Sequence, residues 1–98
     1  MTKKVQTKVF DPAEFLDTEE AVIAYLETAM EGNDPKHIAR ALGDVARSKG
    51  MSDIAKSSGV GRQALYKALS NEGNPTLETL VAVLSALGLE LTVQKRAA

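Results

Sequence analysis

The sequence predicts a single, mainly α-helical domain of five helices with a short strand near each end. Three observations support this prediction. The chain has 98 residues, which is enough for one small hydrophobic core. Between residues 17 and 88, apolar residues recur at helical spacing, whereas residues 5–10 and 89–94 alternate with the period of a strand. We expect an N-terminal arm over residues 1–16 and the helical domain over residues 17–98.

The composition is that of a globular protein. Apolar residues make up 44% of the chain and charged residues 26%, which indicates neither disorder nor a membrane protein. No apolar run is long enough to cross a bilayer and no signal peptide is visible, so we expect a cytoplasmic protein. Cysteine is absent, which excludes disulfides, thiolate nucleophiles and cysteine-bound metals.

The charges are distributed unevenly along the chain. The net charge is −1, but residues 1–34 hold three lysines against eight acidic residues, a local charge of −5. Residues 35–98 hold nine basic residues against five acidic ones, a local charge of +4. This asymmetry favours two surfaces with different partners, although a merely polar surface is the alternative.

The ends of the first two predicted helices carry capping residues. Asp17 is the expected N-cap of the first helix, and Gly32 the expected left-handed stop. Asp34 is the expected N-cap of the second helix, with Pro35 in its first turn and Gly50 at its end. These residues predict two helices of about four turns each in the N-terminal half.

The stretch "MSDIAKSSGVGRQALYKALS", residues 51–70, predicts a helix-turn-helix motif. The turn between the two helices needs a residue that tolerates a positive φ, and Gly59 supplies it. Ser52 is the expected N-cap of the first helix. The residues expected to anchor both helices on a shared core are Ile54, Ala55, Val60, Leu65 and Ala68.

The second helix of this motif is expected to point polar residues away from the core. Arg62 suits guanine O6 and N7, and Gln63 suits adenine N6 and N7. Tyr66 and Lys67 suit phosphates, and a glycine at position 61 lets the backbone approach DNA closely. The predicted DNA-binding residues are Ser52, Lys56, Gly61, Arg62, Gln63, Tyr66, Lys67 and Ser70. The alternative is an ordinary helical corner, but the flanking helices favour DNA binding.

The motif and its surroundings resemble a known family. The stretch "ALGDVARSKGMSDIAKSSGVGRQALYKALSNEGNPTLETLVAVLSALGLEL" resembles the core of the Xre/Cro-like regulators, whose fold is the lambda-repressor-like helix-turn-helix domain. With "FDPAEFLDTEEAVIAYLETAMEGND" included, nearly the whole chain resembles the addiction-module antidote proteins, antitoxins paired with RelE/ParE/HigB-type toxins. The run "LYKALSNEGNPTLETL" is the most specific part. Gly61 and Met51 depart from the family, which tends to have Ser or Thr and Gln at these positions.

The resemblance implies a dimeric repressor that binds its own, palindromic operator in double-stranded DNA and neutralises a cognate toxin. The candidate homodimer surface is the helix over residues 77–87 with the strand over residues 89–94. The alternative is that both serve only to close the monomer core. The acidic segment of residues 11–34 is expected to contact the basic toxin. The strand over residues 5–10 is expected to extend the toxin's sheet. The expected toxin-contacting residues are Glu19, Glu27 and Glu31.

Two other functions fit the same residues. One is a prophage-type regulator without a toxin, and the other is a protein-interaction module that does not bind DNA. An enzyme is not expected, because the sequence has no phosphate-binding loop and no catalytic or metal-ligating set, and it implies no cofactor, metal or membrane partner. His37, the only histidine, is expected to be a solvated surface residue.

Overall fold

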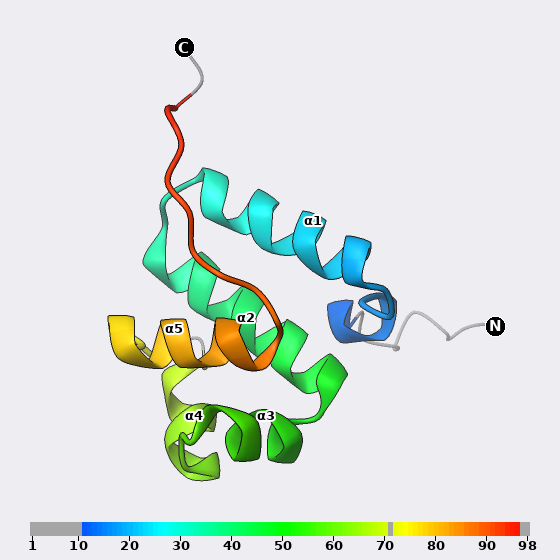
Figure 1. Ribbon diagram of the computed structural model, residues 1–98, viewed down its shortest axis with the longest axis vertical. Coiled ribbons are helices and arrows are strands. Elements are labelled where there is room, and N and C mark those ends of the chain that lie inside the picture. The colour runs from blue at the N-terminus through cyan, green and yellow to red at the C-terminus, as the bar shows by residue number, and fades with distance from the viewer. Residues whose placement is uncertain (1–10, 71, 97–98) are drawn as a thin grey trace, which may run out of the picture.

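The computed structural model describes residues 11–70 and 72–96. The described part forms a short 3-10 helix followed by five α-helices, which confirms the mainly α-helical prediction (Figure 1). The elements are η2 (Pro12–Phe15), α1 (Glu19–Glu31), α2 (Pro35–Lys49), α3 (Met51–Ser58), α4 (Arg62–Ala68) and α5 (Leu77–Ala86). The strand predicted over residues 5–10 lies outside the described residues.

Helix α2 is the centre of the fold. Figure 1 shows it between α1 on one side and α3, α4 and α5 on the other. All six residues from Ala41 to Ala46 are buried, so α2 contacts neighbours on all its sides rather than on one stripe. Its small side chains let the other elements come close to its backbone. The larger core residues of α2 itself are Leu42 and Val45. Those of the other elements in the same core are Leu16, Val22, Leu26, Met51, Ile54, Leu65, Leu69, Val83 and Leu84.

Helix α1 begins and ends one residue later than predicted. Its N-cap is Thr18, whose hydroxyl accepts a hydrogen bond from the Ala21 N–H at 3.1 Å, so the prediction of Asp17 as the cap is wrong. Only the residue directly before the first turn can reach those N–H groups, and that residue is Thr18. The left-handed residue at the other end is Asn33, with φ +55°, whereas Gly32 is right-handed with φ −82°.

Helix α2 begins as predicted. The Asp34 carboxylate accepts a hydrogen bond from the Lys36 N–H at 3.1 Å, and Pro35 is the first helical residue. The helix ends at Lys49, and its C-cap is Gly50, where φ is +101°. Because α3 begins immediately afterwards, Ser52 lies within its first turn, and the prediction that Ser52 is the N-cap is wrong.

The strand predicted over residues 89–94 does not form within the described part of the chain. The C-cap of helix α5 is Leu87, and Gly88 follows it with φ +78°. The Leu89 N–H then donates to the Leu84 carbonyl at 2.8 Å, and the segment runs on across α2 towards the end of α1 (Figure 1). A strand needs a neighbouring strand, and every described element beside this segment is helical.

A buried polar network joins α2 to η2 and α1. Asp44 is the one charged residue among the described residues that is buried, at 5% exposure. The Tyr25 hydroxyl donates to Asp44 Oδ2 at 2.5 Å, and Arg47 donates to Asp44 Oδ1 and to Asp11 Oδ1 at 2.8 Å each. A buried charge is tolerated only when it is paired, and these contacts pair it.

The same network shifts the ionisation of its members. Burial, with the hydrogen bond to Asp44 next in size, raises the pKa of Tyr25 to about 12. The hydrogen bond from Arg47, together with one from the Ala13 N–H, lowers the pKa of Asp11. Hydrogen bonding to Asp11 and Asp44 also raises the pKa of Arg47. Asp11 and Arg47 are therefore charged, and Tyr25 is neutral, throughout the neutral range.

Replacing Tyr25 with phenylalanine tests the network. The variant leaves Asp44 with one donor fewer in a buried position, and we expect a loss of about 1–2 kcal/mol in the free energy of unfolding at neutral pH. A tyrosine in the unfolded chain titrates near pH 10, and the folded one near 12. The contribution is therefore fully present below about pH 10 and is lost as the pH rises towards 12.

Urea unfolding of the parent and of Tyr25→Phe, measured in steps from neutral pH to about pH 12, checks this expectation. Only the difference between the two proteins is used, because other groups titrate equally in both. The network account is wrong if the two proteins are equally stable at neutral pH, or if their difference does not shrink under alkaline conditions.

Candidate nucleic-acid interface

The turn between α3 and α4 contains three residues, 59–61. Helix α3 ends at Ser58, and Gly59 follows in the left-handed conformation with φ +78°, which confirms the positive φ predicted there. The Gly59 N–H donates to the Ala55 carbonyl at 3.0 Å. The Val60 N–H donates to the Ser58 hydroxyl at 3.1 Å. The turn is thus closed by its own backbone and by one serine side chain.

Two leucines hold α4 against the rest of the domain. Leu65 is completely buried and Leu69, just after the last helical residue, is 6% exposed. The backbone of α2 comes very close at this end, because a Cβ atom on Gly43 would lie 2.6 Å from the Leu69 carbonyl oxygen. A Cβ atom on Gly73 would lie 2.2 Å from the carbonyl of Ala68. Glycines at both positions therefore allow the end of α4 to sit where it does.

The opposite face of α4 is exposed to solvent. Every residue of the predicted DNA-binding set is exposed, namely Ser52, Lys56, Gly61, Arg62, Gln63, Tyr66, Lys67 and Ser70. At 100° per residue, Arg62, Tyr66, Gln63 and Lys67 span one continuous face of about 140°. The structure therefore brings these four side chains onto a single surface. Ser52 and Lys56 stand on α3, one turn apart from each other.

Arg62 and Tyr66 interact with each other. The Arg62 guanidinium carbon lies 5.6 Å from the centre of the Tyr66 ring, one helical turn away. A cation above an aromatic face at this distance is attracted by the ring. The contact orders the Arg62 side chain along the outer face of α4. The i, i+4 spacing of the two residues in the sequence permits this contact. Spacing alone does not determine the side-chain conformations, so the contact could not be predicted from it.

Three other features of this surface matter for contacts with a partner. The Ser70 hydroxyl donates to the Lys67 carbonyl at 2.9 Å, so it is already engaged by its own helix. A Cβ atom on Gly61 would have nothing within 4 Å, so packing does not demand glycine at this position. Ala64 is exposed beside Gln63, and its position was not predicted from the sequence because alanine has no polar group.

The charges of the two sides of the domain differ. Helices α3 and α4 carry Lys56, Arg62 and Lys67 against a single acidic residue, Asp53. Helix α1 carries only acidic charges, and the predicted toxin-contacting residues Glu19, Glu27 and Glu31 are all exposed on it. Figure 1 shows α1 and α4 on opposite sides of α2. The acidic and basic parts of the sequence therefore lie on opposite sides of the domain.

The described residues give little support for a metal site or a membrane-spanning helix. His37 is exposed in the first turn of α2. Across residues 11–70 and 72–96, no three His, Asp or Glu side chains gather as a metal site would require. None of the helices in this part of the chain combines the length and apolar character needed to cross a bilayer.

Two glycine variants test the turn at Gly59 that sets the direction of α4. Gly59→Ala forces a side chain into the left-handed region, and we expect a loss of about 1–2 kcal/mol in the free energy of unfolding. Gly61→Ala is the matched control, because its φ is −59° and the space around it is open. We expect that variant to stay within about 0.5 kcal/mol of the parent. Urea unfolding measures both, and equal losses would contradict this account of the turn.

Comparisons with known proteins agree with the antidote resemblance. Residues 6–95 match the family described as "Probable addiction module antidote protein". An uncharacterized protein of Haemophilus influenzae is 46% identical over 90 residues, which cover 92% of this chain and 93% of that protein. No solved structure matches the chain. Because the match covers nearly the whole chain, the protein belongs to the addiction-module antidote family.

Proposed function

We propose that this protein is the antitoxin of a toxin–antitoxin module. In this proposal it binds its own operator through a helix-turn-helix motif formed by α3 and α4, represses its operon in the cytoplasm, and neutralises a toxin of the RelE/ParE type. Membership of the antidote family supports the antitoxin role. The observation that carries the DNA-binding role is the exposed face of α4, which gathers Arg62, Gln63, Tyr66 and Lys67.

The size and chemistry of α4 suit the major groove of DNA. Its seven residues give a helix about 10 Å long, and the groove is about 12 Å wide. Arg62 and Gln63 lie at its N-terminal end and are proposed to read guanine and adenine edges. Tyr66 and Lys67, one turn further on, are proposed to bind phosphates, as is Lys56 on α3. Gly61, Ser52 and Ser70 complete the proposed contact surface.

A dimer follows from the small size of this surface. A helix of two turns contacts only a few base pairs, which is too few to specify one operator in a genome. A two-fold dimer doubles the contacts and requires a palindromic operator with two half-sites. We therefore propose that the protein binds DNA as a homodimer.

The acidic face of α1 is the proposed contact for the toxin. Glu19, Glu27 and Glu31 are exposed there, and a basic toxin would be steered towards them. Because α4 lies across α2 from this face, toxin and DNA can be bound simultaneously (Figure 1). The same antitoxin then both neutralises the toxin and represses the operon.

Replacing Arg62 and Gln63 together with alanine tests the DNA contact. We expect binding to the DNA upstream of the protein's own gene to weaken at least about tenfold, because one or two base contacts are worth about 1–3 kcal/mol each. Lys67→Ala is expected to weaken binding to all sequences alike and to reduce the salt dependence by about one phosphate contact. Gel shifts at several salt concentrations measure both effects.

The matched control for that experiment is Arg40→Ala. Arg40 is exposed on α2 and acts electrostatically on Tyr25, on the α1 side of the domain. Its replacement removes a positive charge without touching α4, and we expect operator binding to change little. If the variant with both Arg62→Ala and Gln63→Ala bound the operator as tightly as the Arg40→Ala control, α4 would not be the helix that contacts the bases.

Reversing charges on α1 tests the toxin contact. The parent, co-expressed with the gene beside its own, should co-purify with a small basic protein. Glu27→Lys with Glu31→Lys should weaken this co-purification, most strongly at low salt. The two lysines would repel a basic toxin, whereas the two glutamates attract it. Glu78→Lys on α5 is the control, which reverses one charge away from α1. Failure of the parent to capture its neighbour would favour a regulator without a toxin.

A further inference from the structure

Tyr66 is an aromatic residue that the fold of the domain does not use. It is 47% exposed and does not belong to the hydrophobic core or to the residues packed against it. The other tyrosine, Tyr25, packs against that core and donates its hydroxyl to Asp44. Within the described part of the chain, no residue forms a hydrogen bond with the Tyr66 hydroxyl. The stability of the domain therefore does not explain an aromatic ring at this position.

The ring of Tyr66 holds the guanidinium of Arg62. The guanidinium carbon lies 5.6 Å from the centre of the ring. Side chains on an α-helix lean towards its N-terminus, so the ring of Tyr66 covers the turn of α4 that begins at Arg62. Both ion pairs among the described residues belong to Arg47, and none of these residues offers Arg62 a carboxylate. The aromatic contact is therefore what orders the Arg62 side chain.

This contact leaves Arg62 able to bind a further partner. A cation above an aromatic ring is attracted through its charge, which uses none of the N–H donors of the guanidinium. By contrast, Arg47 donates to Asp11 and Asp44. A long side chain loses rotamer freedom when it is ordered, and this loss weakens binding unless the side chain is ordered beforehand. The ring thus orders Arg62 before DNA arrives and keeps its donors available.

We propose that Tyr66 is a positioning residue for base recognition. Its ring holds the Arg62 guanidinium where it reaches O6 and N7 of one guanine in the operator, and discrimination at that base pair depends on the ring. The inference rests on the proposed function, because it requires α4 to lie in the major groove. It adds to the phosphate contact proposed for the Tyr66 hydroxyl, since a phosphate contact carries no sequence information.

Two substitutions separate the ring of Tyr66 from its hydroxyl. Tyr66→Phe keeps an aromatic face for Arg62 and removes the hydroxyl. Tyr66→Leu removes the ring and introduces a residue of high helix propensity, so α4 is retained. Because position 66 is exposed and outside the core, both variants should fold as the parent does.

The base pair that Arg62 contacts is identified first. Each G·C pair in the bound part of the upstream DNA is replaced by A·T, and the dissociation constant is divided by that for the unchanged DNA. This quotient is the discrimination ratio. The pair contacted by Arg62 has a ratio of at least about fivefold for the parent, because a bidentate base contact supplies that much discrimination. Its ratio should be close to one for Arg62→Ala.

The Tyr66 variants are then compared at that base pair. We expect Tyr66→Leu to lower the discrimination ratio about two- to fivefold, which corresponds to an exposed cation–π contact. Tyr66→Phe should keep the parent's ratio, while its affinity for both DNAs falls equally because a phosphate contact is lost. In the Arg62→Ala background, Tyr66→Leu should leave the ratio unchanged, because the residue that it positions is absent.

The nuclear magnetic resonance spectrum of the free protein tests the ordering of Arg62 without DNA. Protons that lie over an aromatic ring resonate upfield of their usual positions. The Arg62 side-chain protons should therefore resonate further upfield in the parent and in Tyr66→Phe than in Tyr66→Leu. Equal Arg62 resonances in all three proteins would overturn the positioning role.

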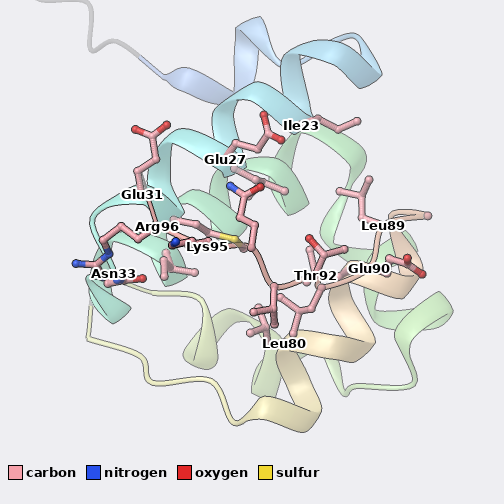
Figure 2. A pocket seen from close by; sticks show the side chains of 18 residues that line it. Ile23, Glu27, Glu31, Asn33, Leu80, Leu89, Glu90, Thr92, Lys95 and Arg96 are labelled. Atoms are coloured by element: carbon pink, nitrogen blue, oxygen red, sulfur yellow. The ribbon is translucent and has the colours of Figure 1, made fainter. Parts of the chain in front are cut away.

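The Tyr66 variants leave the acidic side of the domain unchanged, and this provides a control. Figure 2 shows Glu27 and Glu31 at the groove between α1 and the segment of residues 88–96, and no residue of α3 or α4 lines this groove. Both variants should therefore retain the parent's midpoint of urea unfolding and co-purify with the neighbouring gene product as the parent does.

The DNA measurements distinguish failure of the positioning role from failure of the proposed function. The positioning role is wrong if Tyr66→Leu keeps the parent's discrimination ratio, or if Tyr66→Phe lowers it as much as Tyr66→Leu does. Either result would leave DNA binding by α4 standing. A further loss of discrimination on adding Tyr66→Leu to Arg62→Ala would assign the ring to the base itself and overturn the role. A parent that bound no upstream DNA would overturn the proposed DNA-binding function and the positioning role together.

Discussion

The close approach of α2 to the end of α4 is the constraint on which the arrangement of the domain depends. At Gly43 the Leu69 carbonyl oxygen occupies the space that any larger residue would need for its Cβ atom, at 2.6 Å. This contact allows Leu65 and Leu69 to enter the core together. The direction of α4 is therefore set by the central helix as well as by the turn at Gly59. Everything proposed for the outer face of α4 depends on that direction.

The same helix holds the acidic side of the protein. Asp44 and Arg47, one turn apart on α2, bind Tyr25 of α1 and Asp11 before η2. Helix α2 thus makes a close contact with the end of α4 at Gly43 and a polar, charged contact with α1. The acidic N-terminal third and the basic middle of the sequence are placed on opposite sides of one helix, so two partners with opposite charge requirements need not compete.

Local features of the sequence were sufficient to predict most of the elements. The five helices, the cap at Asp34 and the positive φ at Gly59 each follow from residues that act on their immediate neighbours. Thr18 in place of Asp17, and α3 beginning before Ser52, depend on where the chain enters the domain, which spacing alone leaves open by a residue or two. The exposed set on α4 was predicted from helical periodicity. The Arg62–Tyr66 contact and the Asp44 network depend on side-chain conformations and tertiary distances. The alternation over residues 89–94 predicted a strand, but pairing needs a partner that the described residues do not supply.

The central claim is that α4 is the DNA-reading helix of an antidote protein, and amide chemical shifts of the labelled protein during titration with its own upstream DNA test it most directly. The account predicts that the largest changes map to Lys56 and to residues 61–67. Amides in the middle of α1 should keep their positions. Changes confined to α1 and the C-terminal segment, with α4 unaffected, would contradict it.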